Sequence, residues 1–425
     1  MIVAVLVIFA VLSMLSVPIA IATGIAVALG LVFFGSFPPE LMFQKMVTGI
    51  DNFTLVAIPL FVLTGNLMNS GGITERIFTF VRKCLGHRNG GLAHANVGAS
   101  VLFAGMSGSA VADAAGLGAV EIKAMRDQGY DVGFSAGITA ASSVIGPIIP
   151  PSIPLVIYGA IAQVSVGQLF VAGLVPGLLL ALSLSMMIVW MGRGGRFPRE
   201  PRANYRERFS ALGRAGLSLA TPAIILVGLI GGVFTPTEAG AVAALYALVI
   251  SLVVYRTIRL RDLPKIFIET MITTAIVTFI ISNVSAFSWI LAVSQAGSAF
   301  VEGVRGLTDN PIIVLLIINL CLLVLGCLIE AGAVLIIMTP ILLPLAVSVG
   351  VDPLHFGIII VLNLMIGVAT PPVGMSLFVT AHVAGIPIEK MMRAILPFLV
   401  PLFAALLVVT YVPEVVMFLP RLLFP

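Results

Sequence analysis

Charged residues are scarce in this sequence. Asp, Glu, Lys and Arg make up 9% of its 425 residues, whereas 60% of the residues are hydrophobic. Soluble domains carry roughly 25% charged residues, so this composition excludes a water-soluble fold. Apolar runs of about 17–25 residues, the length needed to cross a bilayer, recur throughout the chain. The net charge of +4 is too small to favour nucleic-acid binding, and we expect no nucleic-acid partner.

Other familiar signals are also missing. The first apolar run, residues 2–21, has no basic flank, because the first lysine is Lys45; we therefore expect a retained span and not a cleaved signal peptide. The three cysteines (Cys84, Cys321 and Cys327) lack metal-ligand spacing, which predicts a packing role. No Gly-x-x-x-x-Gly-Lys-Ser/Thr sequence is present, so ATP is not the expected energy source.

What the sequence does contain is a repeated pattern of glycine and proline at a fixed offset of 221 positions (326 − 105). The matched residues are Gly105 with Gly326, Gly129 with Gly350, Asp131 with Asp352, Gly146 with Gly367, Pro150 with Pro371, Pro151 with Pro372, and Pro176 with Pro397. Both copies lie in apolar sequence, where Gly and Pro interrupt helices. Matched interruptions in two halves of a membrane protein are typical of secondary transporters with a site near the midplane.

The few basic residues are clustered, and the clusters predict the topology. They occupy 76–88, 123–126, 193–214, 256–265 and 390–393, which the positive-inside rule places in the cytoplasm. The stretches poor in Lys and Arg are placed outside, together with both termini: 36–52, 302–310, and those around 163, 235–238 and 352. We interpret the Arg-rich stretch as a topology signal and solvated linker, with binding of anionic membrane lipid as the alternative.

Ten apolar runs are expected to span the membrane: 2–21, 22–36, 53–70, 134–162, 168–191, 216–233, 239–255, 266–292, 355–383 and 394–418. Two more apolar segments, about 92–120 and 311–344, have both flanks on one side, so each is predicted to be a re-entrant helical hairpin, with two very short spans as the alternative. Five spans and one hairpin in each half invert the second half relative to the first. The predicted fold is an all-α polytopic membrane protein with repeats at 1–195 and 216–425, joined by a cytoplasmic linker at 196–215.

The hairpin tips carry polar groups. The first tip, Gly105–Ala110, contains Ser107 and Ser109 and is expected to interrupt its helix; its hydroxyls and carbonyls are suitable ligands for a small hard cation. Packing by small residues is the alternative. The second tip contains Glu330, an intramembrane carboxylate that could help bind a cation, take up a proton, or pair with Arg; a hydrogen-bonded structural carboxyl is the alternative.

A double proline follows each hairpin. Consecutive prolines remove two amide donors and clash with preceding carbonyls, so the spans 134–162 and 355–383 are expected to be broken helices. The freed carbonyls would face a cation, and the N-terminus of the next half-helix an anion. The carbonyls expected to lack intrahelical partners are those of Ile145, Ile149, Ile366 and Thr370. A simple kink is the alternative, but two breaks in register with two hairpins favour a transport site.

These motifs resemble a known family. The Gly-Met-Ser-Gly-Ser tip, the Gly-Pro-Ile-Ile-Pro-Pro-Ser and Gly-Val-Ala-Thr-Pro-Pro-Val-Gly breaks, and Phe-Thr-Pro-Thr-Glu-Ala at 234–239 are similar to the large membrane subunit of tripartite ATP-independent periplasmic (TRAP) transporters. The resemblance covers essentially the whole chain. It implies an elevator-type, sodium-driven transporter of the bacterial inner membrane for a small organic anion, such as sialic acid or a dicarboxylate. It also implies two partners, a small four-helix membrane subunit and a periplasmic substrate-binding protein.

The resemblance further implies two or more sites for Na⁺ as coupling ion. The first site would use Ser107 or Ser109 with the backbone of Ile145, Gly146, Ile149 and Pro150. The second would use the 328–332 turn, including Glu330 and Gly332, with the backbone of Gly367, Thr370 and Pro371. The anion would lie between the sites, near Ser107, Ser109, Ser152, Thr370, Thr380 and His382.

Other functions compete with this interpretation. The nearest is a sodium- or proton-coupled anion carrier of related architecture that needs no binding protein. A more distant one is an intramembrane serine protease, because Gly105-Met106-Ser107-Gly108 fits a Gly-x-Ser-Gly pattern with His382 as a possible base. Such four-residue patterns arise easily in Gly- and Ser-rich spans, and a protease would not explain the shared register. A passive channel fits poorly, because re-entrant pore loops usually accompany oligomeric symmetry.

Overall fold

A computed structural model of the chain describes residues 2–15, 17–35, 37–193, 195, 197–295, 301–303, 306, 308 and 310–424, with side chains except at 14, 19 and 105–107. Every regular element in these ranges is helical, in agreement with the predicted fold class. The side chain of Ser107 and parts of the predicted outer loop at 302–310 lie outside the described residues.

Helices follow one another along nearly the whole described chain. They are α1 Ile2–Met14, α2 Ile19–Phe34, α3 Glu40–Ile50, η1 Phe53–Val56, α4 Ala57–Ser70, α5 Ile73–Leu85, α6 Gly91–Ser107, α7 Ala110–Asp127, α8 Val132–Ser143, α9 Ile153–Ala162, α10 Val166–Met191, α11 Tyr205–Ile230, α12 Pro236–Val249, η2 Ile250–Val254, η3 Leu260–Asp262, α13 Leu263–Val293, α15 Pro311–Leu328, α16 Ala331–Ser348, α17 Pro353–Val368, α18 Met375–Ala384, α19 Ile388–Tyr411 and α20 Pro413–Leu423.

The lengths and surfaces of these helices fit a protein that spans a membrane. Among the described residues, eight helices are long and apolar enough to cross a bilayer, and shorter apolar helices accompany them. Large apolar side chains such as Phe209 and Val227 are each 71% exposed, and many others on the outward helix faces are similar. Contiguous apolar surface of this extent is unfavourable in water, so it is the surface that lipid covers.

The two predicted hairpin segments each contain two helices in contact. α6 and α7 meet at Gly108, whose φ of +59° is readily adopted only by glycine, and Ser109 then caps α7. α15 and α16 meet at Ile329, which is extended, and Glu330 caps α16. The interruption lies within the predicted tip Gly105–Ala110: α6 continues to Ser107, and the break is at Gly108 and Ser109.

Both double prolines lie in helix interruptions. α8 ends at Ser143, and α9 begins at Ile153 with Ser152 as its cap. α17 ends at Val368, and α18 begins at Met375. The Pro150–Pro151 and Pro371–Pro372 peptide bonds are both cis.

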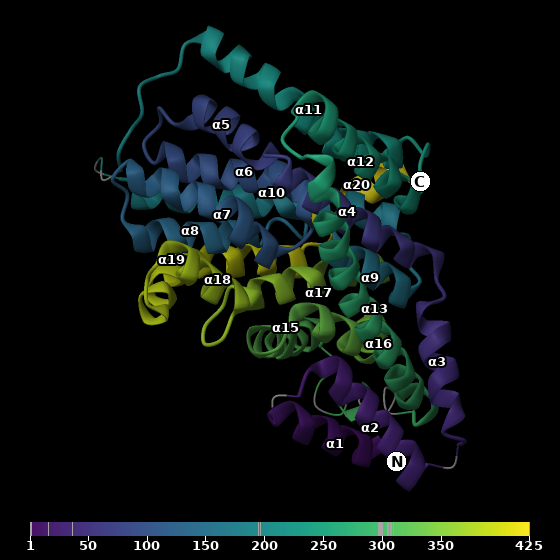
Figure 1. Cartoon of the computed structure of the whole chain (residues 1–425). Helices are drawn as coiled ribbons and strands as arrows, with labels where there is room; N and C mark the ends of the chain where they lie inside the picture. The colour runs from purple at the N-terminus through teal and green to yellow at the C-terminus, as the bar shows by residue number, and fades with distance from the viewer. Residues whose placement is uncertain are drawn as a thin grey trace.

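The interrupted helices pack against each other across the two halves in a reciprocal way. α8 contacts α18 and α19, and α17 contacts α9 and α10. Likewise α7, the second arm of the first hairpin, contacts α18, while α16, the second arm of the second hairpin, contacts α9. In Figure 1 α18 and α19 accordingly lie beside α7 and α8 in the middle of the molecule, and α15 lies below α17.

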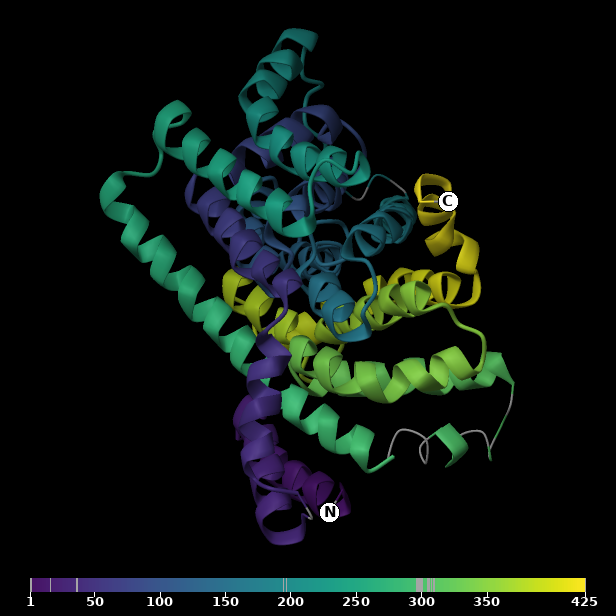
Figure 2. The same ribbon diagram turned by 90° about the vertical axis from the view of Figure 1, so that its right-hand side faces the viewer.

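A single long helix borders this central group. α13, from Leu263 to Val293, packs against α2, α3 and α4, and also against α16. Figure 2 shows it as the long green helix that runs past the central helices toward the N-terminal end of the chain. It therefore links the N-terminal helices with the second hairpin.

Several predicted boundaries are wrong, and each has a local cause. The outer loop predicted at 36–52 contains α3. The linker predicted at 196–215 is helical from Tyr205, where α11 begins. The span predicted at 394–418 is two helices, because the extended residue before Pro413 ends α19 at Tyr411 and α20 follows.

The first two predicted spans differ too, because the chain turns before Ile19, with Pro18 at the start of α2. In addition, α5 was not predicted as a separate helix. It is amphipathic: Ile73, Ile77 and Phe78 are buried, while its last turn carries Arg82 and Lys83.

Candidate functional site

The first helix interruption, residues 144–152, lies against the first hairpin. A Cβ on Gly146 would collide with the Asp113 carboxylate, whose Cγ lies 3.2 Å away from that position. A Cβ on Gly108 would lie 3.1 Å from the Ile153 nitrogen and 3.2 Å from the Pro151 oxygen. Glycine at both positions therefore lets the hairpin tip and a carboxylate of α7 approach the interrupted backbone.

Asp113 is the acidic group of this region. It lies in the first turn of α7, and its side chain is only 2% exposed. A carboxylate near a helix N-terminus interacts favourably with the helix dipole. Beside the interrupted backbone it also supplies a negative oxygen ligand of the type that hard cations prefer.

The carbonyls of the first interruption differ from the prediction in part. The Ile145 carbonyl accepts backbone hydrogen bonds from Ile148 at 3.1 Å and Ile149 at 3.2 Å, so the expectation that it lacks a partner is wrong. The chain closes a tight turn there before the prolines begin. For the Ile149 carbonyl, no hydrogen bond to any described residue is found.

The second interruption, residues 369–374, lies against the second hairpin more tightly. A Cβ on Gly367 would lie 2.8 Å from the Gly326 carbonyl carbon and 2.9 Å from its Cα. Two glycines from matched repeat positions thus place the α15 backbone directly against the end of α17. No side chain separates the two segments.

The carbonyls here repeat the pattern of the first interruption. The Ile366 carbonyl accepts from the Ala369 nitrogen at 3.0 Å and the Thr370 hydroxyl at 2.7 Å, so the prediction for Ile366 is also wrong. Within the part of the chain that the structure describes, the Thr370 carbonyl accepts no hydrogen bond. Each interruption therefore retains one of its two expected free carbonyls.

Glu330 is engaged with backbone at the second hairpin tip. Its carboxylate accepts hydrogen bonds from the Gly332 nitrogen at 2.9 Å and the Ala333 nitrogen at 2.8 Å, which caps α16. The side chain is exposed, and it lines a cavity. This geometry is that of a hydrogen-bonded structural carboxyl, although a capping carboxylate can still attract a cation.

The two interruptions are joined by a hydroxyl pair. Ser143 Oγ, at the end of α8, lies 3.1 Å from Ser376 Oγ in the first turn of α18, and both residues are buried. The end of one interrupted helix thus meets the start of the other half-helix. Any ion or ligand between the interruptions would lie close to this contact.

Each half also holds its interrupted helix against the first arm of its hairpin by buried polar side chains. In the first half, Ser142 Oγ donates to Asn96 Oδ1 at 2.7 Å. In the second half, Asn363, which is 221 positions after Ser142 (363 − 142), donates to Asn319 Oδ1 at 2.7 Å and to its carbonyl at 3.0 Å. Ser142 and Asn363 occupy corresponding positions and differ in type, whereas their partners Asn96 and Asn319 are both asparagine but lie two positions out of register (319 − 96 = 223).

The hairpin tips border two cavities beside α13. Ser109 lines one of about 160 Å³, together with Asn66 and Asn69 of α4 and Thr273 of α13. The second tip lines one of about 810 Å³, whose walls include neighbouring residues of α13 such as Ile276. The openings beside the two tips are therefore adjacent along a single helix.

The predicted anion-binding residues lie in different surroundings. Ser109 borders the smaller cavity. Ser152 is buried, donates to the Pro147 carbonyl and caps α9. Thr380 is buried and donates to the Ser376 carbonyl at 2.7 Å, and His382 is exposed in the last turn of α18. Ser152, Thr370, Thr380 and His382 line neither tip cavity.

Sequence reasoning missed four polar residues of this region: Asn66, Asn69, Asp113 and Thr273. A signal existed for the two asparagines, because they lie three positions apart in an apolar span, where polar side chains are costly and often functional. Asp113 was passed over although it lies in the first turn of α7, four positions after Ser109. Only the packing of α7 on the interruption shows its position.

The fold and this paired site define a multi-pass membrane permease. Residues 6–415 match the family model described as tripartite ATP-independent periplasmic transporter, DctM component. The chain is 47% identical to the sialic acid TRAP transporter large permease protein SiaM of Vibrio cholerae, over 89% of each chain. It is 40% identical to the C4-dicarboxylate TRAP transporter large permease protein DctM of Pseudomonas aeruginosa, over 94% of this chain and 93% of that one. The chain therefore belongs to the large-permease family of TRAP transporters, and its relatives are transporters, not enzymes.

A solved structure supports the fold alone. The YdaH transporter of Alcanivorax borkumensis is similar with a TM-score of 0.64 over 87% of both chains, at 14% sequence identity.

Proposed function

We propose that this protein takes up a small organic anion by sodium-coupled secondary transport, as the large membrane subunit of a TRAP transporter. The observation that carries the proposal is the meeting of two interrupted helices at the Ser143–Ser376 contact, each with a hairpin against it. Irregular backbone within a membrane protein persists where it is buried or lines a cavity, and it then offers carbonyls and helix ends to ions.

The interruptions supply suitable ligands for two sodium ions. At the first, the Ile149 carbonyl and the Asp113 carboxylate are candidates, beside the predicted Ser109 and the backbone of Gly146 and Pro150. At the second, the Thr370 carbonyl joins the backbone of Gly367, Pro371 and the 328–332 turn. No cluster of three His, Cys, Asp or Glu occurs among the described residues, which suits an oxygen-ligated alkali cation better than a transition metal.

The anion would bind between the sodium sites, beside the tip cavities. Asn66, Asn69 and Thr273 provide neutral hydrogen-bonding groups there, and Ser109 adds the cap of α7. Bound sodium ions and the N-termini of α7 and α16 would provide the positive potential that a carboxylate needs. The substrate class rests on the relatives, whose names specify sialic acid and C4-dicarboxylates.

The reciprocal packing of the halves supports an inverted repeat and an elevator mechanism. In this proposal the hairpins and interrupted helices move together, and the helices around α13 form the scaffold. Outer termini and a cytoplasmic α10–α11 linker are part of this proposal; Figure 1 shows the N-terminus at the lower end of the molecule and the C-terminus at the right. Partners would be a small four-helix membrane subunit and a periplasmic substrate-binding protein.

Reconstitution tests this proposal. The chain and its small subunit would be placed in liposomes and supplied with candidate binding proteins loaded with labelled sialic acid or dicarboxylate. We expect uptake that needs an inward sodium gradient and the binding protein but no ATP. Uptake of free anion without any binding protein would instead identify the related symporter mechanism, and sodium-independent flux would contradict the proposal.

A further inference from the structure

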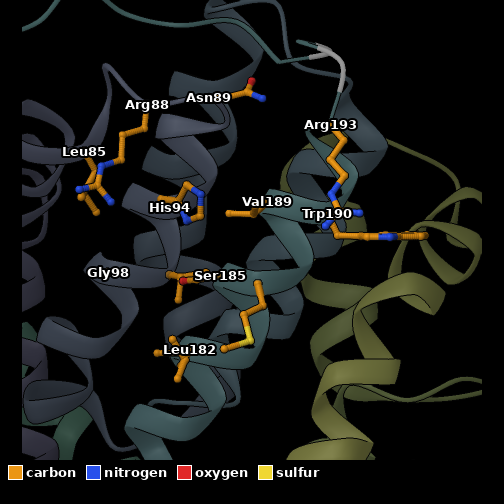
Figure 3. A pocket seen from close by; sticks show the side chains of 13 residues that line it. Leu85, Arg88, Asn89, His94, Gly98, Leu182, Ser185, Val189, Trp190 and Arg193 are labelled. Atoms are coloured by element: carbon orange, nitrogen blue, oxygen red, sulfur yellow. The ribbon is translucent and has the colours of Figure 1, made fainter.

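A second large pocket lies away from both helix interruptions. It has a volume of about 810 Å³ and is bordered by the α5–α6 connection, α6 and α10. Figure 3 shows Arg88 and Arg193 on opposite sides of its upper end and Leu182 near its lower end. The proposed transport site uses none of these residues.

The upper end of this pocket is positively charged, and the described residues place no counter-ion beside Arg88 or Arg193. Two neighbouring cations are paired, Arg82 with Glu200 at 2.6 Å and Lys83 with Glu207 at 3.3 Å, whereas Arg202 and Arg208 have no ion pair among the described residues. Arg88 and Arg193 form no ion pair or side-chain hydrogen bond with any described residue, and both are exposed. Burial and the guanidinium groups of Arg208, Arg202 and Arg88 lower the pKa of the adjacent His87, which indicates a positive potential at this end.

The remaining walls are mostly apolar, with Asn89, His94 and Ser185 as their polar members, and they open toward the lipid. Met186, Val189 and Trp190 on the outward face of α10 are each 56–60% exposed, and Val97 and Gly98 of α6 form the opposite wall. Trp190 lies at the end of α10 near Arg193, the position at which tryptophan is enriched at membrane interfaces. An apolar groove thus leads from two free guanidinium groups along a membrane helix.

From this geometry we infer that the pocket binds an anionic phospholipid, with its phosphate at the positively charged end where Arg88 and Arg193 lie and an acyl chain along α10. The phosphate brings negative charge to the end of the pocket where neither arginine has an ion-pair partner among the described residues, and guanidinium groups bind phosphate with several hydrogen bonds. The apolar walls explain why a lipid fits better than a free anion. Basic residues at a membrane surface are a recognised determinant of anionic-lipid binding.

The bound lipid would stabilise the element that carries the first interruption. The α6 wall belongs to the first hairpin. A Cβ on Gly177 of α10 would collide with Ile149, and one on Gly173 with the Ile148 carbonyl, so α10 packs directly on the interruption. A lipid between α6 and α10 thus contacts both supports of this region.

Trp190 provides the test. The chain has two tryptophans, so Trp289→Phe leaves Trp190 as its only one. In this variant of the full chain in detergent, we would titrate phosphatidylglycerol or phosphatidylcholine with brominated acyl chains and follow quenching of Trp190 fluorescence. We expect half-maximal quenching at about tenfold lower concentration with phosphatidylglycerol, given the attraction of two arginines.

Two double variants that remove the same charge distinguish binding in this pocket from nonspecific electrostatic attraction of anionic lipid to the protein. Adding Arg88→Gln and Arg193→Gln should remove the preference for phosphatidylglycerol, whereas Arg259→Gln with Arg261→Gln in another basic stretch should keep it. Equal quenching by both lipids, or equal loss in both double variants, would overturn the proposal. If the small subunit protects Trp190 from quenching by both lipids, the proposal is overturned and the pocket is a protein interface. If millimolar inorganic phosphate displaces phosphatidylglycerol, the proposal is overturned and the pocket is a free-anion site.

Discussion

The two helix interruptions share a backbone plan but differ in what their glycines accommodate. Gly146 makes room for a side chain, the Asp113 carboxylate, whereas Gly367 makes room for backbone, that of Gly326. The backbone carbonyls behave alike in the two halves, since those of Ile149 and Thr370 each accept no hydrogen bond from a described residue. The difference teaches that the duplicated part of the site is its main chain, while the carboxylate that packs directly on an interruption, Asp113, is present in one half only.

The largest effect is expected from restoring continuous helices. Replacing Pro150–Pro151 or Pro371–Pro372 with Ala-Ala removes the obstacle that proline presents to a helix, about 3 kcal/mol per residue. We expect sodium-driven uptake to fall to background in both variants while the protein still inserts and purifies. Uptake in liposomes and size-exclusion profiles would measure this.

The chain offers a matched control for these variants. Pro176 and Pro397 are duplicated as well, but they lie inside the continuous helices α10 and α19. Pro176→Ala and Pro397→Ala should therefore retain most of the uptake. If all four variants lose uptake equally, or if the double-proline variants keep normal sodium dependence, the interruptions are only kinks.

The next largest effect is expected from removing the charge of Asp113, which only the first half has beside its interruption. Asp113→Asn keeps the shape of the side chain but removes its charge, which at short range in a partly buried site is worth a few kcal/mol. We expect the sodium concentration for half-maximal uptake to rise by about tenfold or more. Glu121→Gln removes the other buried carboxylate of α7 and is the control, with an expected change under about threefold. A similar response in both variants would argue against a specific role of Asp113.

Which features of the two interruptions can be predicted from the sequence depends on how far apart in the chain the interacting residues lie. The local backbone conformation is set by the residue itself at Gly108, Pro150 and Pro371. The sequence therefore predicts the positions of the hairpins and interruptions to within a few residues. Asp113 and Gly146 are 33 positions apart (146 − 113), and nothing local pairs them. The Ile145 and Ile366 carbonyls were misjudged because the chain forms tight turns before its prolines, which the loss of amide donors alone does not reveal.

The two glycines should respond differently to an added methyl group. In Gly367→Ala the Cβ meets the backbone of Gly326, which cannot move away, so we expect a loss of about 1–3 kcal/mol in stability and a lower melting temperature. In Gly146→Ala the Cβ meets a side chain that can rotate, so sodium affinity should change more than stability. Thermal unfolding and sodium titration of both variants would check this, and the reverse order would contradict the comparison.

The smallest effect should come from the polar pairs behind the interruptions. Asn363 makes two hydrogen bonds to Asn319, whereas Ser142 makes one to Asn96 and one to the Thr139 carbonyl within its own helix. Truncating Asn363 to Ala leaves buried Asn319 groups without a partner, at a cost of about 1–3 kcal/mol. We expect Asn363→Ala to lower the melting temperature more than Ser142→Ala. An equal shift would mean that the halves are held equally.

The number of sodium ions moved with each anion tests the central claim most directly. In liposomes containing the complete transporter, the membrane potential at which net uptake reverses gives this ratio for known sodium and anion gradients. Two interruptions that each bind a cation predict at least two sodium ions per anion. A ratio of one or zero would contradict the account, because then at least one of the duplicated interruptions would bind no coupling ion.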